Sequence, residues 1–340
     1  MNNSNKKKII LVVLKNVGIV LLGILLISIP YSLLIKSEEQ IVSKKKVEEK
    51  MEVATRKDNA IVYKGKKYRY NNSLSNFLFL GIDTREKVNT SQGKANAGQS
   101  DVIFVLSWDR IQHEFTLISI PRDTMTQIEV FDVSGESIGK TTEHISLAYA
   151  FGDGNWKSCE LAKNAVSNLL YQVPIQGYSA LNLDSLPLIV KAVGGVPVTV
   201  PDNSLEEVNS EFINGSQVIL DENNVETFIR YRDTTKSQSA LVRLSRQKVF
   251  LDAYKTCAIE QFEKESGFVS DLYVDLKPYM VTNIGVDQLV KIMEDAAKEG
   301  EQISLTIPGE GSEGKAFDEY HVDDEKLYEM VIEVFYEEVD

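Results

Sequence analysis

Three short runs of almost entirely apolar residues constrain the fold of this chain more than any other feature. The runs span residues 76–81, 102–108 and 115–120. A strand with one wet face alternates apolar and polar side chains, whereas a continuous apolar run is typical of a strand covered on both faces. Covered strands need helices packed against the sheet, and segments of helical periodicity follow along the chain. The sequence therefore predicts a layered α/β domain.

Periodicity and turn residues place the other expected elements. Two short strands separated by a glycine turn are expected in residues 61–70, and Gly194-Gly195 ends a helix. The expected helices span about 143–151, 157–171, 185–193, 241–265, 286–298 and 323–338, and the further expected strands span 178–183, 196–200, 225–231 and 302–307. No linker composition divides residues 71–340, so we expect one folded domain there.

An uncharged apolar segment near the N-terminus, residues 17–35, is long enough to span a bilayer, and residues 9–14 precede it with a further apolar stretch. Lysines lie on its N-terminal side and no small-residue cleavage pattern follows it, which favours an uncleaved anchor over a cleaved signal peptide. We therefore expect a single-pass protein of the cell membrane. Its parts would be a cytoplasmic tail at 1–8, a transmembrane anchor at 9–35, a stalk with a short hairpin at 36–70, and an extracytoplasmic catalytic domain at 71–340.

The net charge of −13 is unevenly distributed. Residues 1–36 contain five lysines and no acidic residue, so the rest of the chain is more acidic than the total. A domain this acidic does not hold a nucleic-acid backbone by general electrostatics, so we expect no nucleic-acid partner. Any anionic ligand must be held by a local group of arginines. Cys159 and Cys257 are too few for a disulfide framework, and both a bond between them and two buried thiols stay open.

Such a group of arginines stands at the ends of expected elements. Arg122 follows the third apolar run, and Arg230 and Arg232 lie two apart in an expected strand, so they point to the same side of it. Arg243 and Gln247 lie four apart on one face of an expected helix. Singly, each would be an ordinary surface residue, but arginine presents a rigid fork of donors that matches phosphate oxygens. As a set, they predict a phosphate-binding site.

Two aspartates can complete this site with a metal ion. Asp83 ends the first apolar run and Asp101 begins the second. If the two strands are neighbours, both carboxylates meet at one edge of the sheet, where ligands of open α/β sheets bind. Two carboxylates together with phosphate oxygens and waters suit Mg²⁺. The alternative is that Asp83 makes a turn and Asp101 caps one.

In their order along the chain, these segments resemble the LytR-CpsA-Psr (LCP) family of cell-wall enzymes. No single piece is specific, whereas the ordered set is, and it covers roughly residues 76–250. The resemblance implies an α-β-α layered sandwich with a central mixed sheet and a hydrophobic tunnel for a polyprenyl chain. The expected N-terminal anchor also fits it. The matching pieces are Phe77–Arg85, Ser100-Asp101, Leu117–Thr124, Ala148–Gly152, Val193–Val198, Arg230–Asp233 and Arg243–Gln247.

The resemblance implies a membrane-anchored, extracytoplasmic phosphotransferase of a Gram-positive bacterium. Members attach a glycopolymer linked to undecaprenyl diphosphate, such as teichoic acid or capsular polysaccharide, to peptidoglycan through a phosphodiester. Carried over residue by residue, it makes Asp83 and Asp101 the ligands of Mg²⁺, with Mn²⁺ as the alternative ion. In our hypothesis of the mechanism, Asp123 and Asp233 are candidates for orienting arginines. The implied catalytic residues are Arg122, Arg230, Arg232, Asp83 and Asp101, and the implied diphosphate-binding residues are Arg85, Arg122, Arg230, Arg232, Arg243 and Gln247.

Departures from the family's pattern keep other functions open. Gln99 stands where the family usually has arginine, and Ala240-Leu-Val242 stands where it usually reads Asp-Phe-Gly. The first alternative is a non-catalytic LCP-like protein that binds or regulates at the wall. The second is a hydrolase that cleaves lipid diphosphates or releases the polymer, with water as the acceptor.

Overall fold

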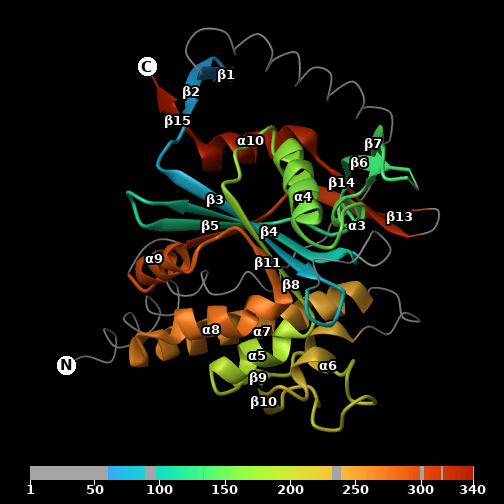
Figure 1. The fold of residues 1–340 in the computed structure, drawn as a ribbon, viewed down its shortest axis with the longest axis vertical. Helices are drawn as coiled ribbons and strands as arrows, with labels where there is room; N and C mark the ends of the chain where they lie inside the picture. The colour runs from blue at the N-terminus through green and yellow to red at the C-terminus, as the bar shows by residue number, and fades with distance from the viewer. Residues whose placement is uncertain are drawn as a thin grey trace.

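A six-stranded mixed sheet forms the centre of the computed structural model (Figure 1), which describes residues 60–88, 97–132, 134–231, 239–298, 302–314 and 317–339. In spatial order its strands are β11 (Met280–Thr282), β8 (Gly177–Asn182), β3 (Leu74–Ile82), β4 (Ser100–Asp109), β5 (Glu114–Ser119) and β12 (Gln302–Thr306). The three apolar runs are β3, β4 and β5, as the sequence predicted. β8 runs parallel to β3 and β12 parallel to β5, whereas the other neighbouring pairs are antiparallel.

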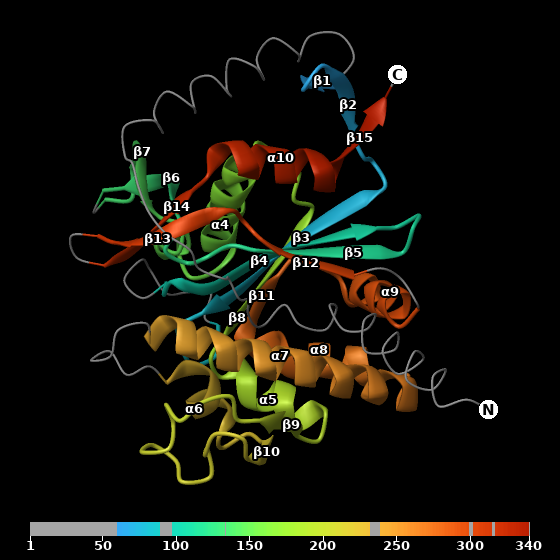
Figure 2. The same cartoon turned by 180° about the vertical axis from the view of Figure 1, so that it is seen from behind.

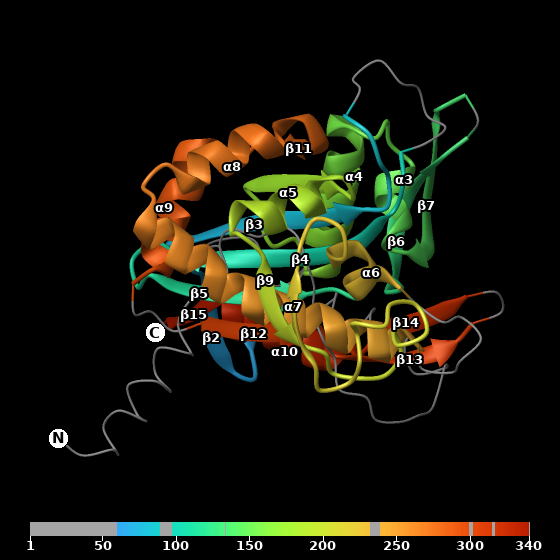
Figure 3. The ribbon, with the colours of Figure 1, turned by 90° about the horizontal axis from the view of Figure 1, so that it is seen from below.

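Helices cover both faces of this sheet, because its central strands are apolar on both sides (Figures 1 and 2). In β3, Phe77 and Phe79 enter one hydrophobic core, and Leu78 and Leu80 enter the other, as the two-residue period of a strand requires. The second core packs against α4 (Trp156–Leu169) and α10 (Asp324–Phe335). The first core is closed by α5 (Ser185–Ala192), α7 (Ser239–Lys264), α8 (Phe268–Leu276) and α9 (Val286–Ala296), the group in front of the sheet in Figure 3.

Smaller sheets lie at the periphery. β1 (Ala60–Tyr63) and β2 (Lys66–Tyr70) form the predicted hairpin, and β15 (Tyr336–Val339) pairs with β2 on its other side. Ile61, Tyr328 and Ile332 form a small buried cluster that packs this hairpin against α10. The other pairs, which the sequence had not suggested in full, are β6 (Met125–Phe131) with β7 (Ser137–His144), β9 (Val196–Thr199) with β10 (Gln217–Leu220), and β13 (Gly309–Glu313) with β14 (Asp318–Val322).

The strand expected at 225–231 was wrong: Val225–Arg230 is a short helix, α6. Its buried residues are Val225, Phe228 and Ile229, and this spacing of three and then one is helical. The apolar and aromatic residues of this segment are also common in strands, and so few residues do not separate the two periods. Arg230 therefore lies in a helix and not in the expected strand, and Arg232 lies outside the described residues.

The bounds of two expected helices also differ from the structure. The first two residues of the segment at 143–151 belong to strand β7 and a turn follows them, so only α3 (Leu147–Ala150) is helical. The C-terminal helix ends at Phe335, and the residues expected to prolong it form β15.

The predicted tail at 1–8 and anchor at 9–35 lie outside the described residues, so the anchor stays a prediction. Among the residues that the structure describes, no helix is long and apolar enough to cross a membrane. The two cysteines are free thiols, with Cys159 buried in α4 and Cys257 half-buried in α7.

Candidate functional site

Asp83 and Asp101 lie side by side, because β3 and β4 are neighbouring strands. Ile82 at the end of β3 pairs with Ser100 at the start of β4, so the two aspartates occupy the same edge of the sheet. The Asp83 backbone N–H donates to the Gln99 carbonyl at 3.1 Å, and the Gln99 N–H donates to Asp83 Oδ1 at 2.6 Å. Gly98 permits this close approach: its φ is +77°, and a Cβ there would lie 2.8 Å from Asp83 Oδ1.

Arg122 reaches this pair from the turn after β5. One terminal nitrogen donates to Asp101 Oδ1, the other donates to Gln99 Oε1 at 2.6 Å, and Nε lies 3.3 Å from Asp123 Oδ1. All three guanidinium nitrogens therefore have partners, and Asp123 orients the arginine as predicted. Gln99, which departs from the family's usual arginine, has a definite role here as an acceptor for Arg122.

Two other arginines, Arg230 and Arg85, share one carboxylate, Glu226, which the sequence pattern did not indicate. Arg230 donates to Glu226 Oε1 at 2.7 Å across one turn of α6, and Arg85 donates to the same oxygen at 2.5 Å. Arg85 also donates to Asp184 Oδ1 at 3.0 Å. Burial raises the pKa of Glu226, but hydrogen bonds from Arg85 and Arg230 outweigh this and leave it below its usual value. Glu226 is therefore an anion between two cations.

The electrostatics of Asp101 show which predicted residues come together. Burial raises the pKa of Asp101 above its usual value, the charge of Arg122 opposes this, and the nearby charge of Asp83 adds to it. Arg243 and Arg230 also lower this pKa, so both cations act on the same carboxylate. Asp83, Arg122, Arg230 and Arg243 therefore lie within electrostatic reach of Asp101, where β3 ends, β4 begins, β5 and α6 end and α7 begins.

The other predicted site residues either contact the site through Glu226 or have side chains that lie outside the described part of the chain. Arg85 joins the site through Glu226 and not through a contact with either aspartate. Arg232 and Asp233 lie outside the described residues. Gln247 is in α7, one turn after Arg243, but its side chain is also outside the description. Their expected roles therefore stay predictions.

The two aspartates fit a magnesium ion that is completed by a ligand. Within the described ranges there is no group of three or more histidine, cysteine, aspartate or glutamate residues able to hold a metal alone. Mg²⁺ commonly uses one or two carboxylates together with phosphate oxygens and waters, which is what Asp83 and Asp101 offer. The repulsion between these two carboxylates, one of them largely buried, is also what a cation would relieve.

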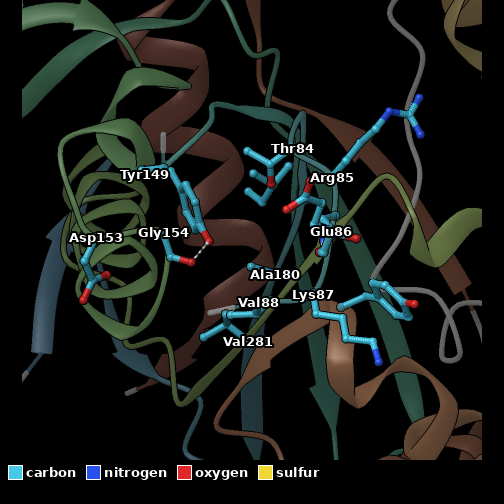
Figure 4. A pocket seen from close by; sticks show the side chains of 14 residues that line it. Thr84, Arg85, Glu86, Lys87, Val88, Tyr149, Asp153, Gly154, Ala180 and Val281 are labelled. Atoms are coloured by element: carbon cyan, nitrogen blue, oxygen red, sulfur yellow. Dashed lines mark hydrogen bonds between the residues drawn. The ribbon is translucent and has the colours of Figure 1, made fainter. Parts of the chain in front are cut away.

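A polar cavity lies beside the site, because Ile82 and Thr84, the two chain neighbours of Asp83, both line it (Figure 4). Two of its lining residues are joined by a hydrogen bond, in which the Tyr149 hydroxyl donates to the Gly154 carbonyl at 3.1 Å. More than half of its lining residues are polar or charged, and the apolar ones are Ile82, Val88, Ala97, Ala180 and Val281. This composition does not match the hydrophobic tunnel that the resemblance implies. The polar and charged lining residues are Thr84, Arg85, Glu86, Lys87, Asp153, Asn182, Tyr149 and Tyr279.

Comparison with known proteins decides the family. A model of the LytR_cpsA_psr family matches residues 31–334, which is most of the chain. The chain belongs to this family. The match confirms the resemblance that the ordered motifs gave, and it extends well beyond the segment 76–250 that carried them.

Relatives of this LytR_cpsA_psr protein carry transferase names. The polyisoprenyl-teichoic acid–peptidoglycan teichoic acid transferase TagU of Halalkalibacterium halodurans is 28% identical over 239 residues, which cover 69% of each chain. The TagU of Enterococcus faecalis is 35% identical over 121 residues, 36% of this chain and 34% of that one.

Solved structures share the fold of this family member. The crystal structure of Bacillus subtilis TagV has a TM-score of 0.56 and 21% identity, and the match covers 77% of this chain and 97% of that one. A structure of TagT bound to LI-WTA also has a TM-score of 0.56, with 19% identity and coverage of 77% and 90%. At these identities the likeness establishes the fold alone.

Proposed function

We propose that this protein attaches an anionic glycopolymer of the teichoic acid or capsular polysaccharide type to peptidoglycan through a phosphodiester. The donor would be the polymer linked to undecaprenyl diphosphate, in the outer leaflet of the membrane that residues 9–35 are expected to cross. The observation that carries the proposal is the ion pair of Arg122 with Asp101, with Asp83 beside it and with Arg230 and Arg243 near enough for their charges to lower the pKa of Asp101. The transferase names of the relatives, and the LI-WTA bound to TagT, support the same class of substrate.

The arginines suit a diphosphate because they concentrate positive charge on an otherwise acidic chain. Arg122, Arg230 and Arg243 come from three separate segments of the chain, and the positive charge of each lowers the pKa of Asp101. Fixed cations around a phosphoryl group stabilise the charge that develops on its oxygens during transfer, and they need no reorganisation at that moment. Asp101 and Gln99 hold Arg122, and Glu226 holds Arg230, so two of the three are oriented before a ligand arrives.

The proposed reaction is one displacement at phosphorus. A peptidoglycan sugar hydroxyl attacks the phosphate that carries the polymer, a new P–O bond forms, and the bond to the bridging oxygen of the diphosphate breaks. The hydroxyl proton is released and undecaprenyl phosphate leaves. Mg²⁺, or Mn²⁺ in its place, would be held by Asp83 and Asp101 and would neutralise charge on the diphosphate oxygens. The arginines bind and orient the same oxygens from the protein side.

The test is a transfer assay with the full-length protein, the lipid-linked polymer and peptidoglycan, with and without EDTA. We expect covalently linked polymer from the wild type. Arg230→Ala should lower the rate by about 100- to 1000-fold, the usual cost of removing one charge-stabilising donor. Arg110→Ala is the matched control: this exposed arginine also bonds other groups, the carbonyls of Asn72 and Ser73, but at the far end of β4.

The outcomes separate the alternatives. Free polymer without a peptidoglycan link would support the hydrolase, and bound but unreacted polymer would support the non-catalytic binding protein. Transfer by Arg230→Ala at the wild-type rate, with both variants melting like the wild type, would refute the assignment of the arginines.

A further inference from the structure

The side chain of Arg246 is buried and is therefore inaccessible to a ligand. It is 1% exposed and is the largest of the fully buried side chains in the described part of the chain. Its Nε donates to the Phe228 carbonyl at 2.7 Å, one terminal nitrogen donates to the Tyr231 carbonyl, and the other donates to Ser204 Oγ. Asp202 Oδ1 lies 3.7 Å away and partly balances its charge.

This burial is costly, so the contacts need a reason. A buried charge loses its hydration, and replacing a buried ionic group by an apolar side chain of similar size is often neutral or stabilising. Burial indeed lowers the pKa of Arg246, and the positive charge of Arg243 lowers it further. Packing alone therefore does not account for an arginine at this position, whereas the geometry of its acceptors does.

The two backbone acceptors bracket Arg230. The Phe228 carbonyl lies in the last turn of α6, and Tyr231 has already left the helix with φ −53° and ψ 133°. Arg246 satisfies both carbonyls at once and so fixes the backbone on either side of Arg230. Arg243 stands one turn earlier on α7, on the same side of the helix as Arg246.

We infer that Arg246 is a positioning residue: from inside the protein it locks the end of α6 to α7 and so sets Arg230 and Arg243 at a fixed separation around the ligand. It also ties in the segment before β10 through Ser204 and Asp202. The inference rests on the proposed function only in treating Arg230 and Arg243 as anion-binding residues. The effect of Arg246 on the backbone of α6 does not depend on that function.

The experiment compares Arg246→Met and Arg246→Lys with a control of similar burial, Asp295→Asn. Asp295 is 8% exposed and accepts from Trp108 Nε1 at 3.1 Å, at the opposite end of β4 from Asp101. Trp108 lies seven residues along β4 from Asp101, a distance of about 23 Å at about 3.3 Å per residue of strand. Each full-length variant is examined by thermal unfolding, by binding of inorganic pyrophosphate, by hydrogen exchange of peptides covering α6, and by kcat and KM for transfer.

Arg246→Met should bind pyrophosphate about tenfold more weakly, which is what losing well-placed charged hydrogen bonds costs. Its α6 peptides should exchange faster, and transfer should fall mainly in kcat by about 10- to 100-fold, since small misplacements of a catalytic group have that effect. Arg246→Lys keeps the charge and one donor, so it should recover part of each loss. Asp295→Asn should melt earlier than the wild type while pyrophosphate affinity and α6 exchange stay unchanged.

Wild-type pyrophosphate affinity and α6 protection in Arg246→Met, measured where it is folded, would overturn the inference. If that variant does not fold, the same comparison with Arg246→Lys decides. If the wild type itself does not bind pyrophosphate, the proposed diphosphate site fails, but α6 exchange still decides the lock. Faster exchange confined to α6 supports it, and unchanged exchange overturns it.

Discussion

Replacing Gly98 by alanine should damage the site without touching a functional side chain. Gly98 has φ +77°, and an added Cβ would lie 2.4 Å from Thr84 Cγ2 and 2.8 Å from Asp83 Oδ1. The left-handed backbone costs an alanine about 1–2 kcal/mol. Forcing an additional carbon into occupied space costs about 1–3 kcal/mol more. We therefore expect Gly98→Ala to lower the free energy of unfolding by about 2–5 kcal/mol.

Gly194→Ala separates these two contributions. Gly194 has a similar φ of +73°, and a Cβ there would have no atom within 4 Å. This control should lose only the backbone part, about 1–2 kcal/mol, and should transfer polymer at the wild-type rate. Gly98→Ala should lose transfer as well, because relieving the overlap displaces the Asp83 carboxylate or the backbone that holds it.

Urea denaturation of both variants gives the difference in unfolding free energy, and the transfer assay gives the functional loss. The reasoning would be refuted if Gly98→Ala unfolded within about 0.5 kcal/mol of Gly194→Ala, the usual range of a neutral substitution, and kept wild-type transfer. A large loss of stability with full transfer would show instead that Asp83 is not needed in its present place.

Further predictions concern charge and burial. Glu226→Gln keeps an acceptor for Arg230 but removes a negative charge near the bound anion. Losing a repulsion of about 1 kcal/mol between that charge and pyrophosphate should tighten pyrophosphate binding roughly fivefold. Weaker binding in calorimetry would contradict this. Burial raises the pKa of Asp295, but hydrogen bonds from its lysine and histidine partners outweigh this and lower it. Its stabilisation is therefore present above the unfolded value of about 3.9 and lost as pH falls through the folded-state pKa. Asp295→Asn should cost about 1–3 kcal/mol at pH 7 and progressively less as the pH falls below about 3.9 in urea titrations, whereas a cost that does not change with pH would be inconsistent. Cys159 is fully buried and burial raises its pKa, so it should react with a thiol reagent only after unfolding, and rapid native labelling would exclude this packing.

The central strands of the sheet, and the proximity of three candidate site residues, could be predicted from the sequence for physical reasons. A strand buried on both faces needs apolar residues throughout, so β3, β4 and β5 were visible as runs. Residues at the ends of such strands must share an edge when the strands pair. The proximity of Asp83, Asp101 and Arg122 could therefore be predicted without knowledge of their contacts.

The partners of the arginines could not be predicted in the same way. Glu226 becomes a partner of Arg230 only if α6 is helical, since four residues make one turn of a helix and place side chains together. A helical assignment of this segment, from the spacing of Val225, Phe228 and Ile229, would have revealed it. Arg246 gave no such signal, because its acceptors lie 18 and 15 residues away and only the packed structure shows that its side chain is buried.

The small sheet of β1, β2 and β15 determines how the domain would carry a pull from a membrane tether. β2 lies between β1 and β15, so the first and last described strands flank the same neighbour, at one end of the molecule (Figure 1). Tension arriving ahead of Ala60 would act first on the hydrogen bonds of β1 with β2. It would then be shared with β15 and α10, before it reached β3. The candidate site is at the far end of β3 from this attachment. In a domain tethered this way, the peripheral sheet would take up tension before it reached the strand that leads to the candidate site.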